Sequence, residues 1–354
     1  MSVSSLPFLH GALAAVLPKL AAWRRDFHAH PEAGWTEFRT AALIIRRLRE
    51  LGYAIRMGEA ACASDRRMGV PSSAVLAAAR ERALEHGADA ELVAGMGDGY
   101  TGFWADLDCG PGPVTAFRFD MDCNEVAECA EESHRPVREG FASRWPGLMH
   151  ACGHDGHAAV GLGLAEVLVS IRRHLRGRIR LIFQPAEEGA RGALPMSEAG
   201  AVDGVDVLFG FHIGFKAEGP GSLICGTQGF LATTKRDVLF SGVPAHAGAA
   251  PEEGKDALLA ACSAVVNLHA ISRNGKGGTR IAVGRLEGGE ARNVIPASAR
   301  LFMETRGETT ELDAYMTAES ERILRASADL WGCACEWRTV GNSAGGGSSP
   351  ELAR

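Results

Sequence analysis

Residues 149–157 combine a thiol, imidazoles and a carboxylate, which are the side chains that bind divalent transition metals. Cys152 and His154 stand two positions apart. Alternate side chains of an extended or looped backbone lie on one face, so one ion could bind both. Asp155 is placed to hold an imidazole by hydrogen bonding. The alternative is a loop with a buried thiol and solvated histidines, but further candidate ligands follow later strands and favour a metal site.

A pair of adjacent carboxylates, Glu187 and Glu188, follows a predicted strand over residues 178–184. In extended backbone the two side chains cannot point the same way, so one can bind a cation while the other stays free beside it. Such a free carboxylate is the general base of metal-assisted hydrolysis. Alone, the pair would indicate a solvated loop. The preceding Gln184-Pro185 and the cluster at residues 149–157 favour the functional interpretation.

His212 ends the apolar run 207–211, where a polar side chain is costly unless it is satisfied. It could be a core histidine bonded to backbone, or a metal ligand. As a ligand it completes a mixed sulfur, nitrogen and oxygen set that suits Zn²⁺ or Mn²⁺, namely Cys152, His154, Glu188 and His212. Four such groups shared between two ions leave positions open for water, as a two-metal hydrolase requires.

Two further carboxylates, Asp120 and Asp122, end the predicted strand over residues 114–120. We expect them to orient the ligands, although they could also hold a cation directly. His28 and His30 close the first predicted helix and could interact with its dipole, so we leave them outside the metal set.

The elements that carry these residues alternate between strands and helices. Predicted strands occupy residues 114–120, 178–184 and 205–211, and predicted helices occupy residues 13–29, 37–51, 158–175 and 192–199. Strands that alternate with helices are typical of a βαβ sheet with helices on both faces. Each polar cluster follows the carboxyl end of a strand, which is the edge where open α/β sheets bind ligands.

A second unit begins near residue 229. Its predicted elements are strands 231–240, 279–286, 297–305 and 333–340 and helices 256–272 and 310–331. The order βαββαβ is that of the split βαβ sandwich. We therefore assign residues 1–227 to a metal-binding domain and residues 228–340 to a small α+β domain. Residues 341–354 begin with a linker composition.

The composition is that of an ordinary globular protein, with 46% apolar and 23% charged residues among 354. A formal net charge of -6 gives no sign of a nucleic-acid surface, and no apolar run reaches the length of a membrane span. The nine cysteines show no disulfide framework and residues 1–10 lack signal-peptide features, so we expect a reducing cytoplasm. Residues 58–100 are expected to form an inserted surface element.

Several motifs together resemble the M20 metallopeptidase and amidohydrolase family, in the branch that binds metal through a cysteine and includes hippurate and auxin-conjugate amidohydrolases. They lie at residues 23–28, 149–157, 183–189, 245–248 and 293–296. The CGHDGH and QPAEEG motifs are highly specific together, and the resemblance covers nearly the whole chain. It implies an α/β fold in which a three-layer, mixed-sheet catalytic domain carries an inserted α+β, ferredoxin-like lid and dimerisation domain.

The resemblance also implies roles for the residues of the first domain. Cys152, as a thiolate, would bridge two divalent ions, Mn²⁺ or Zn²⁺, which His154, Glu188 and His212 would also bind. Glu187 would be the base that activates the attacking water and later protonates the leaving amine.

Three residues of the second domain receive roles in the same way. His246 would reach the site of a partner chain, where it would polarise the scissile carbonyl. Asn293 and Arg306 would recognise the substrate carboxylate. From the residues alone, turn chemistry explains the asparagine, and an arginine at a strand end is usually just exposed.

The implied reaction is hydrolysis of an N-acyl amino acid, with p-aminobenzoyl-glutamate as the expected substrate and a hippurate or auxin conjugate as the alternative. The implied partners are this small molecule and a second subunit, in a homodimer or in a heterodimer with a homologue, without nucleic acid or membrane. Members of the family continue after the lid with a segment that returns to the first domain and supplies a final histidine ligand, and none follows residue 354. An inactive binding or assembly subunit is therefore a further alternative. The resemblance also implies that residues 341–354 are a remnant of the returning segment, and we assign them to the first domain.

Overall fold

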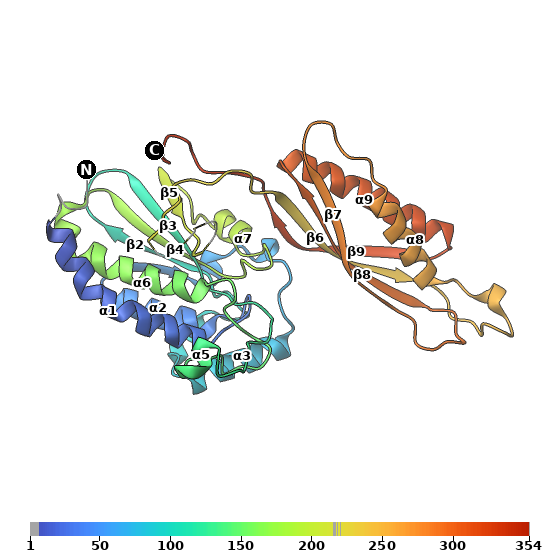
Figure 1. The fold of residues 1–354 in the computed structure, drawn as a ribbon, viewed down its shortest axis with the longest axis horizontal. Coiled ribbons are helices and arrows are strands. Elements are labelled where there is room, and N and C mark those ends of the chain that lie inside the picture. Colours follow the sequence, from blue (N-terminus) through green and yellow to red (C-terminus); the bar gives the residue numbers. More distant parts are fainter. Residues whose placement is uncertain (1–6, 215–216, 218, 220, 354) are drawn as a thin grey trace. The chain divides into compact units, whose positions relative to one another are not determined.

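The computed structural model describes residues 7–214, 217, 219 and 221–353. The chain divides into two compact units, Met1–Ser222 and Leu223–Arg354 (Figure 1). The sequence places the boundary later, at residue 228, and assigns residues 341–354 to the first domain. The structure groups these residues with the second unit, because residues 341–343 continue its last strand and Gly346 pairs with Phe230.

The first unit contains a five-stranded sheet of order β1-β2-β4-β3-β5. Its strands are β1 (Ala54–Met57), β2 (Phe103–Asp108), β3 (Val114–Asp120), β4 (Arg178–Gln184) and β5 (Val207–Gly210). β3, β4 and β5 run parallel, as predicted, and β2 and β1 extend the sheet in antiparallel pairing. The sequence analysis missed β1 and β2, because β1 has only four residues and both border the unusual segment 58–100.

Helices cover both faces of this sheet. The helices of the first unit are α1 (Pro7–Ala29), α2 (Phe38–Glu50), α3 (Ser73–Glu85), α4 (Ala90–Gly95), α5 (Arg135–Arg138), α6 (His154–Ser170) and α7 (Ala193–Glu198). Successive strand residues point to opposite faces. Phe103 and Phe183 therefore stack beneath α2 and α6, with ring centroids 4.9 Å apart, whereas Trp104 and Ile182 pack on the other face with Met196 of α7. The three-layer α/β prediction is confirmed.

The inserted segment 58–100 connects neighbouring strands. Met57 at the end of β1 pairs with Phe103 at the start of β2, so the segment leaves and re-enters the sheet at one place. Its helices α3 and α4 supply Leu76 and Leu92 to the core beneath α2. Among the described helices, none combines the length and the hydropathy that crossing a lipid bilayer requires.

The second unit contains a separate antiparallel sheet of order β7-β8-β6-β9. Its elements are β6 (Ala232–Ser241), α8 (Ala257–His269), β7 (Thr279–Gly288), β8 (Ser298–Gly307), α9 (Thr310–Leu330) and β9 (Ala334–Ser343). Both helices contribute to one core with Phe240 and Leu301 of the sheet. The predicted βαββαβ order is confirmed, because apolar alternation in the strands and helical periodicity in α8 and α9 are both clear in the sequence.

Candidate metal centre

The metal-binding residues predicted in the first unit meet at the carboxyl edge of its parallel strands. β3 ends at Asp120, which pairs with Gln184 at the end of β4. β5 ends two residues before His212, and α6 begins at His154. Residues far apart in the sequence therefore reach one edge of the sheet, as the βαβ topology predicts.

His154 lies at the centre of this cluster and is fully buried. Its Nδ1–H donates to the backbone carbonyl of Asp122 at 2.8 Å, so its Nε2 faces the carboxylates. Nε2 is 3.7 Å from Oε2 of Glu187, 3.9 Å from Oε1 of Glu188 and 4.0 Å from Oδ2 of Asp120. It is buried without a hydrogen-bond partner, which is unusual for a polar atom and is the geometry of a ligand atom.

Cys152 and His212 approach the same imidazole from another side. The Cys152 Sγ is 3.3 Å from the His212 Nε2, and these atoms lie within 4.8 Å of a ring nitrogen of His154. Each residue has a further hydrogen bond that positions it: the backbone N–H of Cys152 donates to Oδ1 of Asn124 at 3.0 Å, and the ring Nδ1–H of His212 donates to the carbonyl of Ile213 at 2.9 Å.

The negative charges of the cluster favour the binding of a cation. Burial alone would lower the pKa of His154, but Asp122 and Asp120 raise it to about 9, so the site attracts positive charge strongly. Burial and the Glu188 carboxylate raise the pKa of the Cys152 thiol to about 12, so a thiolate here needs a nearby cation. Among the described residues, all groups of three potential ligands include His154: Cys152, His154 and His212; Asp120, His154 and His157; His154, Glu187 and Glu188.

Two local expectations are wrong in detail. α6 begins at His154 rather than at residue 158, and Gly153 before it has a left-handed φ of 93°, so Cys152 and His154 do not alternate along an extended chain. Glu187 and Glu188 follow Ala186, whose φ is 51°, in a turn. The turn brings both carboxylates toward the Nε2 of His154 instead of splaying them apart.

The predicted supporting carboxylates contact the cluster. Oδ2 of Asp122 accepts from the backbone N–H of Glu188 at 3.0 Å. Oδ2 of Asp120 accepts from Nδ1 of His157 at 3.2 Å, and the Nε2 of that imidazole accepts from the N–H of Ile213 at 3.2 Å. The sequence analysis assigned no role to His157. Its position three residues after His154 on one helix could have indicated that the two rings share a face.

The imidazole that Asp155 contacts is that of His28. Oδ2 of Asp155 accepts from Nδ1 of His28 at 2.8 Å and from Nε of Arg24 at 2.7 Å. The Nε2 of His28 is 3.0 Å from Oε1 of Glu128, which His134 also contacts at 2.8 Å. Burial alone would lower the pKa of His28, but the hydrogen bonds to Asp155 and Glu128 raise it above its ordinary value.

We predict that His28→Gln lowers the free energy of unfolding more at pH 6 than at pH 9. The unfolded pKa of histidine is about 6.5, so the stabilising contribution of His28 is complete below that value and is lost as the pH rises through the higher folded pKa. A hydrogen bond to a charged group contributes about 1.5–3 kcal/mol, which sets the expected loss at pH 6. Urea unfolding measures it. His10→Gln, at an exposed position of α1, is the control. A loss that does not vary with pH would contradict the prediction.

In the second unit, the structure brings His246 and Asn293 together. The backbone N–H of Ala247 donates to the carbonyl of Asn293 at 3.0 Å. Nδ1 of His246 accepts from the backbone N–H groups of Gly248 and Ala249, each at 3.1 Å. These bonds fix the imidazole as the tautomer with its proton on Nε2.

Arg306 lies at the other end of the strand that follows this loop. β8 begins at Ser298, next to the loop, and Arg306 comes eight residues later. A strand rises about 3.3 Å per residue, which separates the two by roughly 26 Å. The Nε of Arg306 donates to Oε1 of Glu304 at 2.8 Å. Within a single chain, Asn293 and Arg306 are therefore too far apart to contact the same substrate carboxylate.

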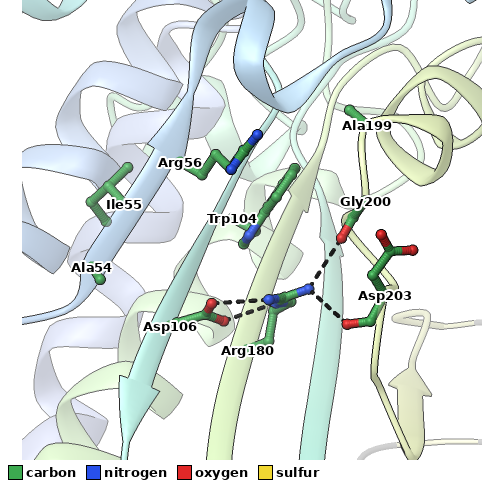
Figure 2. A pocket seen from close by; sticks show the side chains of 9 residues that line it. All are labelled: Ala54, Ile55, Arg56, Trp104, Asp106, Arg180, Ala199, Gly200 and Asp203. Atoms are coloured by element: carbon green, nitrogen blue, oxygen red, sulfur yellow. Dashed lines mark hydrogen bonds and ion pairs between the residues drawn. The ribbon is translucent and has the colours of Figure 1, made fainter.

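A cavity of about 350 Å³ lies away from the metal cluster, on the sheet face that β1 and β2 share with α7. Figure 2 shows Arg180 in its wall, bonded to Asp106 and to the carbonyl of Gly200. Among the described residues that line it, no buried side-chain polar atom lacks a hydrogen-bond partner. We place the site at the metal cluster, because there the buried Nε2 of His154 has no hydrogen-bond partner and lies among potential metal ligands.

The sequence of this chain is similar to the sequences of known proteins. The pattern of Peptidase family M20/M25/M40 matches residues 116–343. The chain is 47% identical over 338 residues to the A subunit of p-aminobenzoyl-glutamate hydrolase of Escherichia coli (strain K12), and the match covers 95% of this chain and 77% of the relative. It is 46% identical over 346 residues to indole-3-acetyl-aspartic acid hydrolase of Enterobacter agglomerans, and the match covers 98% of this chain and 79% of the relative.

The fold has a close match among solved structures. The aminobenzoyl-glutamate utilization protein from Klebsiella pneumoniae superposes with a TM-score of 0.84 at 41% identity, covering 98% of this chain and 81% of that chain. The resemblance seen in the motifs is thus confirmed along most of the sequence, and this chain is shorter than the proteins it matches. On these grounds the chain belongs to Peptidase family M20/M25/M40.

Proposed function

We propose that the chain is a two-metal amidohydrolase that cleaves the amide of an N-acyl amino acid. The observation that carries this proposal is the buried Nε2 of His154, which has no hydrogen-bond partner and faces a thiol, an imidazole and carboxylates. In this proposal Cys152, His154, Glu188 and His212 hold two divalent ions, Mn²⁺ or Zn²⁺. Such ions supply Lewis acidity at the scissile carbonyl.

Glu187 is the general base of the proposed mechanism. The backbone of Glu188 is bonded to Asp122, which suits a ligand, whereas the side chain of Glu187 is more exposed, at 38% against 27%. Burial and nearby Asp120 raise the pKa of Glu187 to about 7, which suits a group that both takes and returns a proton. Its carboxylate takes a proton from the attacking water, whose oxygen bonds to the carbonyl carbon. As the carbon–nitrogen bond breaks, the same oxygen returns the proton to the leaving amine.

The expected substrate is p-aminobenzoyl-glutamate. The names of the two relatives at 46–47% identity both join an aromatic acyl group to an acidic amino acid. The 46% identity to indole-3-acetyl-aspartic acid hydrolase makes that conjugate the second candidate.

We also propose that the active form contains a second subunit, either another copy of the chain or a homologue. Asn293 lies in the loop before β8 and Arg306 lies near the end of that strand, so contact of both with one substrate carboxylate would need two chains. His246 adjoins Asn293, and in this proposal both reach the site of the partner chain, where His246 polarises the carbonyl.

A substrate panel with metal counting tests the proposed function. We expect the chain loaded with Mn²⁺ to hold two ions and to release glutamate from p-aminobenzoyl-glutamate faster than glycine from hippurate, which lacks the acidic side chain. N-acetylglutamate, which lacks the aromatic group, should also be slow, and chelation should stop all hydrolysis. Two bound ions without cleavage of any conjugate would contradict the proposal. One ion or none, again without cleavage, would favour a binding subunit.

A further inference from the structure

The turn that carries Glu187 and Glu188 has an unusual backbone. Among the described residues other than glycine, only Trp35, Ala186 and Ala190 have a positive φ, at 68°, 51° and 56°. Two of them flank the glutamates, and Trp35 packs against Ala186 in one buried cluster. An L-residue adopts this conformation at a cost, and the cost persists only where the surroundings hold the residue in place.

A buried carboxylate holds this turn at its start. Oε1 of Glu37 accepts from the backbone N–H of Ala186 at 2.8 Å, and its Oε2 accepts from the hydroxyl of Thr101 at 2.6 Å. The side chains of Glu37 and Thr101 are fully buried, and Ala186 is 1% exposed. Both side-chain oxygens of Glu37 therefore have a hydrogen-bond partner. One partner is the backbone N–H of Ala186, the residue directly before Glu187.

The direction of the Glu37 side chain is not explained by its own helix. Glu37 precedes α2 at the N-cap position, yet its side chain makes no capping hydrogen bond. Glu32 caps α2 instead, because its oxygens accept from the backbone N–H groups of Arg39 and Thr40 at 2.9 and 2.8 Å. Two equally buried glutamates of one segment thus have different partners, the helix for Glu32 and the turn for Glu37.

The same segment also contacts the turn directly. A Cβ atom at position 34 would lie 2.9 Å from the Cα and the Cβ of Ala186, so Gly34 allows the two backbones to touch. Within the turn, Ala190 N–H donates to the carbonyl of Glu187 at 2.7 Å and Arg191 N–H to that of Ala186 at 3.1 Å. Internal bonds close the turn, and Glu37 ties the closed turn to the segment before α2.

We propose that Glu37 is a positioning residue for Glu187. By holding the Ala186 amide, it fixes the left-handed residue from which Glu187 projects, and so it sets the direction of that carboxylate relative to Nε2 of His154. The inference rests on the proposed function, since it takes Glu187 as the base. It adds a residue that lies about 150 positions away in the sequence and touches neither a substrate nor a metal ligand side chain.

Amide hydrogen exchange of the full chain tests the hydrogen bond between Glu37 and Ala186, and it does not require an active enzyme. In Glu37→Ala we expect the amide of Ala186 to exchange about 10- to 100-fold faster, because the buried N–H of Ala186 loses its hydrogen-bond acceptor. Glu32→Ala is the matched control: the amides of Arg39 and Thr40 should exchange faster and that of Ala186 should not. An unchanged Ala186 amide in Glu37→Ala would overturn the proposal.

Kinetics with p-aminobenzoyl-glutamate test the consequence. In Glu37→Ala we expect kcat to fall about 100-fold with KM and metal content kept, as a displaced catalytic group gives. Glu32→Ala should keep its kcat. Glu37→Gln should restore most of kcat, because its amide oxygen can still accept from Ala186 while its nitrogen donates to Thr101. Should Glu37→Ala not fold, the shorter Glu37→Asp gives the same contrast with Glu37→Gln.

Fast exchange at Ala186 with an unchanged kcat would also overturn the proposal. If the unmodified chain cleaves no conjugate, the proposed function has failed. The exchange result then still decides whether Glu37 holds the turn, so the two failures are distinguishable.

Discussion

Glu187→Gln should keep both metal ions and lose hydrolysis by about 10²- to 10⁴-fold, the range that general-base catalysis contributes. The amide of glutamine cannot take a proton from water, while its size preserves the turn around Ala186. The loss should appear in kcat, because the substrate still binds. Steady-state kinetics with p-aminobenzoyl-glutamate, together with metal counting on the same sample, measure both quantities.

Two variants serve as controls for this result. Glu188→Gln should lose metal as well as activity, since we assign that carboxylate to the ions. Glu198→Gln, at an exposed position of α7, should change neither. Full activity in Glu187→Gln would show that another group takes the proton, and metal loss in that variant would show that the two neighbouring glutamates have exchanged roles.

His154→Ala should empty the site. His154 is common to every three-residue group of potential ligands in the described chain, and its Nε2 faces each of them. We expect fewer than one ion per chain where the unmodified chain holds two, and no measurable hydrolysis. Metal analysis after dialysis gives the count, and circular dichroism shows whether the variant is folded.

His157→Gln is the matched control, because it changes the same residue type on the same buried helix turn. Both nitrogens of His157 already have partners, Asp120 and the N–H of Ile213. The ions should therefore stay bound in this variant, with a smaller loss of activity through the orientation of Asp120. Two ions retained in His154→Ala would contradict the proposed ligand set.

Much of the first unit could be predicted because its signals are local. β3 and β4 have the predicted bounds, since each is a short apolar run that ends in polar residues. Once the strands are parallel, their polar ends must share an edge, and this brings Asp120, Glu187 and His212 together without any knowledge of contacts. The family motifs added the division of roles between Glu187 and Glu188, which position alone does not decide.

The remainder depends on contacts between distant residues. Nothing around Glu37 distinguishes it from Glu32, because both are acidic residues before a helix and either could cap it. Their difference appears only when the turn at Ala186 lies against the segment. The same holds for Asp155: its position in the motif predicted an imidazole partner without saying which, and the ring that reaches it is His28 from α1.

The close approach of Gly34 to Ala186 has a consequence for how this family can diverge. A side chain at position 34 would occupy the space of the Ala186 methyl group, since its Cβ would lie 2.9 Å from that atom. A residue larger than alanine at position 186 would press on the same point. The two sites should therefore covary in evolution: homologues that enlarge one should carry a glycine at the other, although the sites stand more than a hundred positions apart in the gene.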